Sequence, residues 1–94
     1  MEPFYFHSYN RIIGKASDVR ELEREISRLV WENPDAVAYH LSQGHIASWL
    51  ISIGEVELAK ELQSAKTICD VQMEIAKYNE RILMTHRMQT GRMH

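Results

Sequence analysis

The chain has 94 residues, of which 45% are hydrophobic and 26% are charged, and this composition excludes an intrinsically disordered protein. A chain of this length can bury one modest core without disulfides. Its net charge of −2 gives no indication of a protein that binds nucleic acid or an anionic membrane through its overall charge.

The single cysteine, Cys69, excludes an internal disulfide and a cysteine-based metal cluster within one chain, and it favours a reducing compartment. No apolar run approaches the ~20 residues that a membrane helix needs, so we expect no membrane partner. The first residues, Met-Glu-Pro-Phe, lack the basic and apolar segments of a secretory signal. We therefore expect one cytoplasmic domain over residues 1–94.

The N-terminal residues predict a small β-hairpin over residues 4–13. Aromatic and β-branched side chains favour strands on both sides of Ser8-Tyr9-Asn10, where asparagine tolerates the left-handed conformation of a turn. Gly14 is expected to end the second strand. Because a lone two-stranded hairpin is marginal in water, one face must lie on the helices, and Phe4 and Phe6 share that face.

A first helix is predicted over residues 18–31, with Asp18 and Glu21 at the spacing of a capping box. Its apolar face recurs at helical spacing and consists of Val19, Leu22, Ile26, Leu29 and Val30. The other face carries three opposite-charge pairs, each worth only ~0.2–0.5 kcal/mol. The pairs are Arg20–Glu23, Glu21–Arg24 and Glu25–Arg28. We interpret this charged face as solvated.

Two shorter helices are predicted over residues 34–43 and 45–53. Asn33-Pro34 is typical of a helix start, because asparagine caps the helix and proline suits its first position. Gly44 and Gly54 are the expected stops. The apolar stripe of the second of these helices consists of Ile46, Trp49, Leu50 and Ile53.

Residues 55–87 form either one long helix or a broken one. The later part carries a heptad-like stripe of Ile68, Val71, Ile75, Tyr78 and Ile82. An unbroken helix over residues 55–86 would be ~48 Å long, against a diameter of ~32 Å for a compact domain of this size. The segment therefore either breaks near residues 63–68 and folds back, or projects and pairs with another chain.

Together these patterns predict a mainly α-helical fold. A small N-terminal β-hairpin packs on a bundle of four or five helices, and the last helical segment is long.

His7, His40 and His45 are weak candidates for metal ligands. Three neutral imidazoles can bind zinc, but His40 and His45 are five residues apart across Gly44 and do not share a helical face. No acidic residue lies between residues 36 and 54. We interpret these histidines as structural and expect neither a metal nor a cofactor.

No arrangement of catalytic residues is recognisable. Ser42 and Ser48 lie near histidines, but the glycine-flanked elbow of a nucleophilic serine is missing. Cys69 lies between apolar residues on a helical segment, so we expect a small packed side chain. The sequence thus predicts a protein without enzymatic activity and without catalytic residues.

Four short motifs resemble those of an uncharacterised, mainly archaeal domain-of-unknown-function family, numbered 5752. They are Phe4-Tyr5-Phe6-His7, Ile13-Gly14-Lys15-Ala16-Ser17, Tyr39-His40-Leu41-x-x-Gly44-x-x-x-x-Trp49-Leu50 and Ile53-Gly54-x-x-x-Leu58-Ala59. The resemblance covers about residues 4–65 and implies an intracellular domain with no assigned activity. It implies no catalytic role for any residue, and the heptad-like stripe lies beyond it.

We expect an interaction or regulatory module that associates with itself or with a partner helix through the heptad-like stripe, because a small domain is not expected to bury it. One alternative is a regulatory domain that binds a small ligand or metal in the His40–Trp49 region. Another is nucleic-acid association through the C-terminal residues 81–94, which contain three arginines and no acidic residue.

Overall fold

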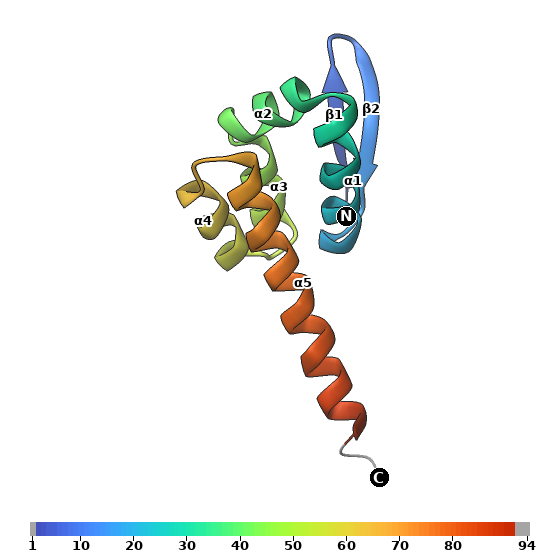
Figure 1. Cartoon of the computed structure of the whole chain (residues 1–94), viewed down its shortest axis with the longest axis vertical. Helices are drawn as coiled ribbons and strands as arrows, with labels where there is room; N and C mark the ends of the chain where they lie inside the picture. Colours follow the sequence, from blue (N-terminus) through green and yellow to red (C-terminus); the bar gives the residue numbers. More distant parts are fainter. Residues whose placement is uncertain (1, 92–94) are drawn as a thin grey trace.

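In the computed structural model, a two-stranded hairpin is followed by five helices (Figure 1). The structure describes the backbone of residues 2–91 and the side chains of residues 2–84. The elements are β1 (Phe4–Ser8), β2 (Arg11–Ala16), α1 (Val19–Glu32), α2 (Pro34–Ser42), α3 (His45–Ser52), α4 (Val56–Ser64) and α5 (Ile68–Gly91). This architecture confirms the predicted fold class.

The hairpin is antiparallel, with a bulge between Phe6 and His7. Phe4 and Phe6 are buried against the helices, as predicted from the period of two. The left-handed residue of the turn is Tyr9, with φ 56°, and not the asparagine that was expected there. Strand β2 also continues through Gly14, so the expected stop at that glycine is wrong.

Helix α1 begins where the sequence predicts. Asp18 Oδ1 accepts a hydrogen bond from the Glu21 backbone N–H at 2.8 Å, and Glu21 Oε1 accepts one from the Ser17 N–H at 2.8 Å. Glu21 is thereby engaged in the cap, which is why its predicted pair with Arg24 does not form. The predicted apolar face of α1 is the buried one.

The residues at their ends determine where helices α2 and α3 start and stop. Asn33 Oδ1 accepts a hydrogen bond from the Ala36 N–H at 3.3 Å and caps α2. Gly44, with φ 74°, separates the two helices, and Gly54, with φ 89°, follows α3. A side chain is strained in this left-handed conformation, so both turns need glycine.

The C-terminal segment breaks at residues 65–67 and folds back, so that α4 and α5 pack as neighbours. Ala65 is extended, with ψ 139°, and the chain then enters α5. Thr67 Oγ1 accepts a hydrogen bond from the Asp70 N–H at 3.1 Å, and Asp70 Oδ2 accepts one from the Lys66 N–H at 3.3 Å. This second capping box explains why a new helix starts there.

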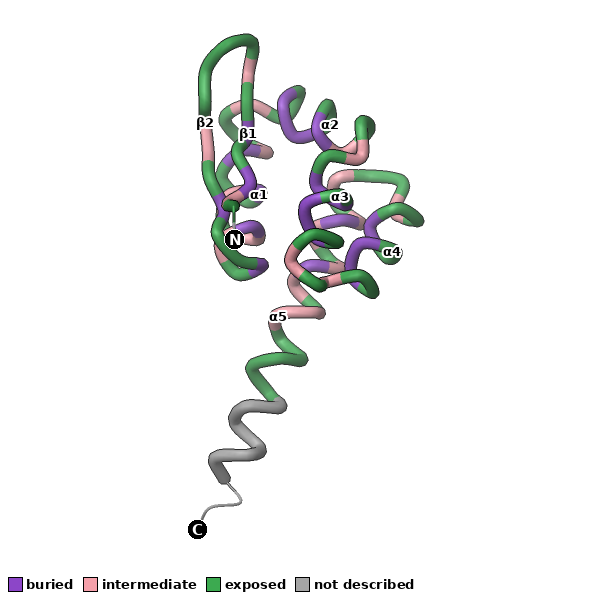
Figure 2. The backbone as a smooth tube through the Cα atoms, turned by 180° about the vertical axis from the view of Figure 1, so that it is seen from behind, coloured by how far each residue is buried: buried purple, intermediate pink, exposed green. Residues whose placement is uncertain are grey.

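The core lies between the hairpin with α1 on one side and the helices α3, α4 and α5 on the other (Figure 2). Its largest fully buried side chains are Phe6, Leu22, Ile26, Leu29, Val37, Ile46, Leu50 and Ile75. Along α5 the backbone changes from buried to exposed as the helix leaves this core. In the part of the chain that the structure describes, no helix is long and apolar enough to cross a membrane.

Candidate functional site

The heptad-like stripe on α5 is divided between the core and the surface. Val71 and Ile75 are 3% and 0% exposed and belong to the core of their own chain. Ile68 and Tyr78 are partly buried against the same core. Ile82 alone of this predicted interface set is largely exposed, at 54%. The domain thus buries most of the stripe itself, because α1 and α4 cover the first half of α5.

Two neighbouring side chains, Tyr78 and Asn79, tie α5 to the starts of α4 and α1, and we call them the clasp. The Tyr78 hydroxyl donates a hydrogen bond to the carboxylate of Glu55, the residue before α4. Asn79 Nδ2 donates to Val19 O at 3.3 Å and to Glu23 Oε1 at 2.7 Å on α1. Burial and the Glu55 carboxylate raise the pKa of Tyr78 to about 12, so its hydroxyl remains a donor at neutral pH.

Beyond the clasp, α5 leaves the body of the protein (Figure 1). Because α1 begins at Val19 and α4 at Val56, neither helix has a further turn to cover α5 past Asn79. The stretch from Glu80 to Gly91, called the projecting end below, is about 18 Å long at about 1.5 Å per residue. Among its described side chains, residues 80–84, the exposed apolar ones are Ile82, Leu83 and Met84, at 54%, 54% and 52%. The apolar character of α5 therefore continues where its cover has stopped.

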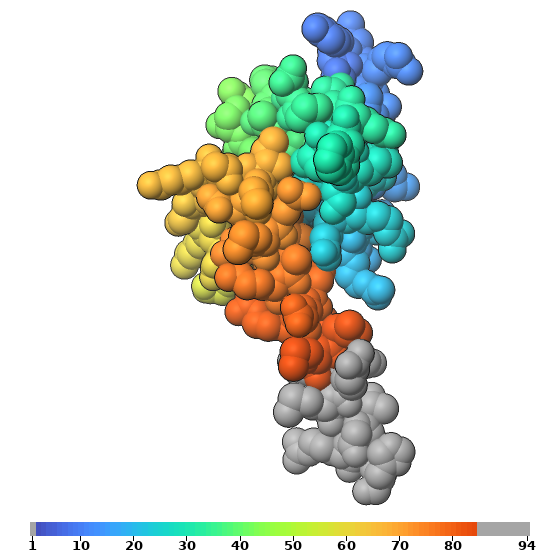
Figure 3. Space-filling model, viewed as in Figure 1, coloured from blue at the N-terminus to red at the C-terminus, as the bar shows by residue number. Residues whose placement is uncertain are grey.

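A groove of about 890 Å³ lies between α1 and α5 beside the clasp. Figure 3 shows the two helices next to each other on one face of the molecule. The groove is lined by Arg20, Glu23, Arg24 and Ser27 from α1 and by Ala76, Asn79, Glu80, Ile82 and Leu83 from α5. Trp31, four residues beyond Ser27, lies on the same side of α1 and is 88% exposed. Sequence reasoning did not identify this groove.

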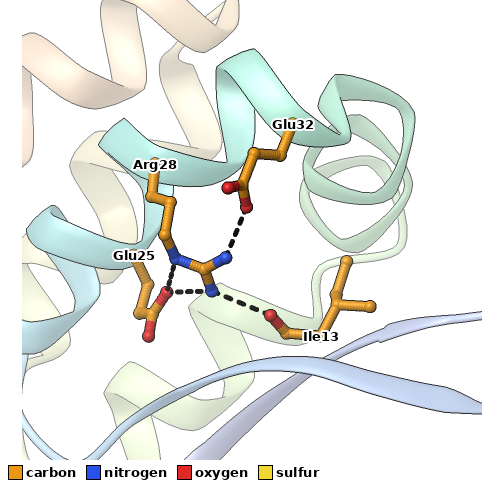
Figure 4. A network of polar contacts seen from close by, with 4 residues as sticks. All are labelled: Ile13, Glu25, Arg28 and Glu32. Atoms are coloured by element: carbon orange, nitrogen blue, oxygen red, sulfur yellow. Dashed lines mark hydrogen bonds and ion pairs between the residues drawn. The ribbon is translucent and has the colours of Figure 1, made fainter.

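Part of the charged face of α1 holds the hairpin (Figure 4). Arg28 pairs with Glu25, as predicted, and also with Glu32, and these carboxylates raise its pKa, Glu25 most. Arg28 Nη2 also donates a hydrogen bond to Ile13 O in β2 at 2.8 Å. A Cβ atom at Gly14 would lie 3.2 Å from this guanidinium, so glycine allows α1 to approach the strand.

The side of α5 that faces α4 carries both acidic and basic groups. The carboxyl groups of Glu61 on α4 and Glu74 on α5 interact, which raises the pKa of Glu61 and lowers that of Glu74. Lys77 Nζ lies 3.3 Å from Glu74 Oε1.

His40, His7 and His45 form one hydrogen-bonded set, which we call the histidine latch. The His7 backbone N–H donates to His40 Nε2 at 2.9 Å, so Nε2 of the neutral His40 is the acceptor. In this tautomer the His40 proton lies on Nδ1, 3.0 Å from His45 Nδ1, whereas in the other tautomer Nε2 donates to His7 O, 3.3 Å away. His40 is 3% exposed, and the latch joins β1, α2 and α3.

The environment of His40 keeps it neutral. Burial lowers its pKa most, the contact of Nε2 with His7 O acts in the opposite direction, and the neighbouring His45 and His7 lower the pKa further. A second proton on His40 would replace the hydrogen bond from the His7 N–H at 2.9 Å by a longer one to His7 O at 3.3 Å, so the latch favours the neutral ring.

A metal ion on His40 would disrupt the histidine latch. A metal on Nδ1 would place the proton on Nε2, which would then donate to His7 O, 3.3 Å away, and the hydrogen bond from the His7 N–H would be lost. The rings of His7 and His45 are exposed, with centroids 6.1 Å and 5.2 Å from that of His40. Among the described residues, no group of three possible ligands is arranged to hold a metal.

The His40–Trp49 region, predicted as an alternative ligand site, is packed by the hairpin. The rings of Phe4 and Phe6 lie with their centroids 5.4 Å and 5.7 Å from that of His40. Trp49 Nε1 donates a hydrogen bond to Glu2 O at 2.8 Å, and its ring lies 6.0 Å from that of Phe4. These side chains occupy the space that a ligand in this region would need.

Two further predicted candidates lie on α5. Cys69 is exposed, so the expectation of a packed side chain is wrong. Arg81 is also exposed, whereas the side chains of residues 85–94, which include Arg87 and Arg92 of the predicted basic tail, lie outside the described part of the chain.

No family model, curated protein or solved structure matches this chain. The resemblance of residues 4–65 to the family numbered 5752 therefore stays a prediction.

Proposed function

We propose that this protein is a non-enzymatic interaction module of the cytoplasm, which associates with a second helical chain through the projecting end of α5. Another copy of itself is the foremost partner. The observation that supports this most is the exposure of Ile82, Leu83 and Met84 on a helix that extends past its own core. Contiguous exposed apolar side chains on a small domain are typical of an interaction site.

The energetics of the projecting end favour a partner. Burying one Ile, Leu or Met side chain stabilises a structure by about 1.5–3 kcal/mol. A helical stretch of this length is marginal in water without packing, although here it continues a helix that is already formed. A second helix that packs on Ile82 and Leu83 would therefore bury these side chains and would also stabilise the helical conformation of the projecting end.

The histidine latch supports a non-enzymatic function. The buried titratable ring, His40, is surrounded by aromatic side chains, and its Nε2 is engaged by the hairpin and its Nδ1 by His45 on α3. A general base needs a nitrogen that can reach a substrate, and His40 is buried and does not line the groove between α1 and α5.

Light scattering after gel filtration at micromolar concentration tests the proposal. The wild-type chain is expected to have the mass of two copies, and the double variant Ile82→Lys and Leu83→Lys the mass of one. Ile51→Lys is the matched control, because Ile51 is 50% exposed on α3 and does not line the groove between α1 and α5, and this variant should behave as the wild type. A strictly monomeric wild type with the amides of residues 80–84 protected from hydrogen exchange would refute self-association.

A further inference from the structure

The α1–α5 groove carries charges that its own chain does not pair. Arg20 and Arg24 line the wall from α1, and Glu80 lines the wall from α5. All three are exposed, and within the described side chains none of them forms an ion pair. Glu23, the predicted partner of Arg20, instead accepts the hydrogen bond of Asn79. The α1 wall thus carries two arginines and the Glu23 carboxylate, a net positive charge, and the α5 wall carries the negative charge of Glu80.

The centre of the same groove is apolar. Ile82 and Leu83 line it, with Ala76 above them towards the start of α5. An apolar centre with charged residues at its margin is the usual anatomy of a protein interface. The occupant must bring apolar side chains to this centre, acidic groups opposite the arginines of α1 and basic groups opposite Glu80 of α5.

A second copy of the chain supplies these apolar, acidic and basic groups when its α5 lies opposite α1 of the first copy. α1 and α5 run in opposite directions along the groove (Figure 1). A two-fold axis parallel to the helices places α1 of each copy opposite α5 of the other, so that arginines face Glu80. An axis across the groove would place α1 opposite α1 and bring Arg20 and Arg24 against arginines of the second copy. Like charges in contact are destabilising, and this selects the first arrangement.

We propose that two copies pair face to face through their α1–α5 grooves, about a two-fold axis parallel to the helices. Arg20 and Arg24 of each copy lie opposite Glu80 of the other, and Ile82 and Leu83 of both copies meet at the axis. The proposal rests on the proposed function, since it takes a second copy as the partner of the projecting end, and it adds the surface and the symmetry of the contact. Because α5 leans towards the start of α1 as it leaves the body, the two projecting ends converge at the axis (Figure 1).

Mixing two charge-reversed chains tests this arrangement. The first chain carries Arg20→Glu and Arg24→Glu, and the second carries Glu80→Arg. Alone, each chain opposes like charges across the axis and should associate on the order of a hundredfold more weakly than the wild type. In the mixed pair both charge contacts are opposite in sign, so an equimolar mixture should regain the mass of two copies. A change of pairing within one chain cannot produce this recovery.

The control chain carries Arg11→Glu and Lys15→Glu, which make the same change in net charge on the hairpin, and it should associate as the wild type does. Circular dichroism confirms that each variant is folded. This geometry is overturned if the wild type associates and the reversed chains associate equally well, or if their mixture stays monomeric. In that case the Ile82 and Leu83 variants still test whether the two copies pair through the projecting end. If the wild type itself is monomeric, the proposed function fails, and this arrangement fails with it.

Discussion

The hairpin and the projecting end of α5 would each be only marginally stable in water alone, but only the hairpin packs against the core. Its inner aromatic face is buried, Arg28 bonds to β2, and the histidine latch bonds to β1. The projecting end has the clasp at its base and, in its described turns, Ile82, Leu83 and Met84 open to solvent. The apolar side chains of the hairpin are thus covered within one chain, whereas those of residues 82–84 on α5 are not, which is why we propose α5 as the site of interaction.

The largest difference between the two ends is expected on truncation of apolar side chains. Phe6→Ala should lower the free energy of unfolding by about 3–5 kcal/mol, because Phe6 is fully buried. Ile82→Ala should change it by less than about 0.5 kcal/mol at concentrations where the chain is monomeric. Urea unfolding followed by circular dichroism measures both. Comparable losses would mean that the projecting end is covered within one chain.

The clasp marks the point on α5 beyond which the helix no longer packs against α1 and α4. Asn79→Ala removes both hydrogen bonds to α1 and should lower the free energy of unfolding by about 1–2 kcal/mol. Lys77→Ala, which breaks an exposed ion pair on the same helix, should cost less than about 1 kcal/mol. Hydrogen exchange at residues 80–84 should accelerate in the first variant. Unchanged exchange there would show that the clasp does not support the projecting end.

Acid should loosen the hairpin in preference to α5. The folded-state pKa of His40 is lowered below its ordinary value of 6.5, so below that pH the unfolded chain binds more protons than the folded one. The contribution of the latch to stability is thus complete above about pH 6.5 and falls as the pH is lowered. His40→Gln should flatten this dependence, and the exchange rate of the His7 amide in nuclear magnetic resonance should report the opening. An unchanged pH profile in this variant would contradict the assignment.

The smallest expected effect is optical. Trp31 is exposed on the groove side of α1, and the other tryptophan, Trp49, is buried in α3. If the groove is covered by a second copy, the emission maximum of Trp31 should move to shorter wavelength as the protein concentration rises. Trp31→Phe should remove the shift and leave the Trp49 emission constant. A shift that persists in this variant would place the change at Trp49 instead.

Much of the fold followed from local patterns. The caps at Asp18 and Asn33, the glycine stops after α2 and α3, and the apolar face of α1 all depend on residues within one or two turns of each other. The turn over Ser8-Tyr9-Asn10 was predicted, but its left-handed residue is Tyr9 and not Asn10. The continuation of β2 through Gly14 was not predicted, because glycine is needed there for the approach of α1, which lies far along the sequence.

The candidate site depended on contacts that are distant in the sequence. The heptad spacing identified the apolar side of α5, but spacing is the same for Ile75, which is buried, and for Ile82, which is not. The clasp joins Asn79 to Val19 across 60 residues, and the latch joins His40 to His7 across 33. No local pattern encodes these pairings.

By itself, the sequence determined the class of fold, where most of the helices start and stop, and which side of each helix is apolar. The tertiary structure decided which of those apolar sides are covered. α1 and α4 begin at Val19 and Val56, and α5 passes both starts at the clasp, so the same stripe is core before Tyr78 and surface after Asn79. The physical reason is that hydrophobic periodicity is a property of one helix, whereas burial depends on where its neighbours end.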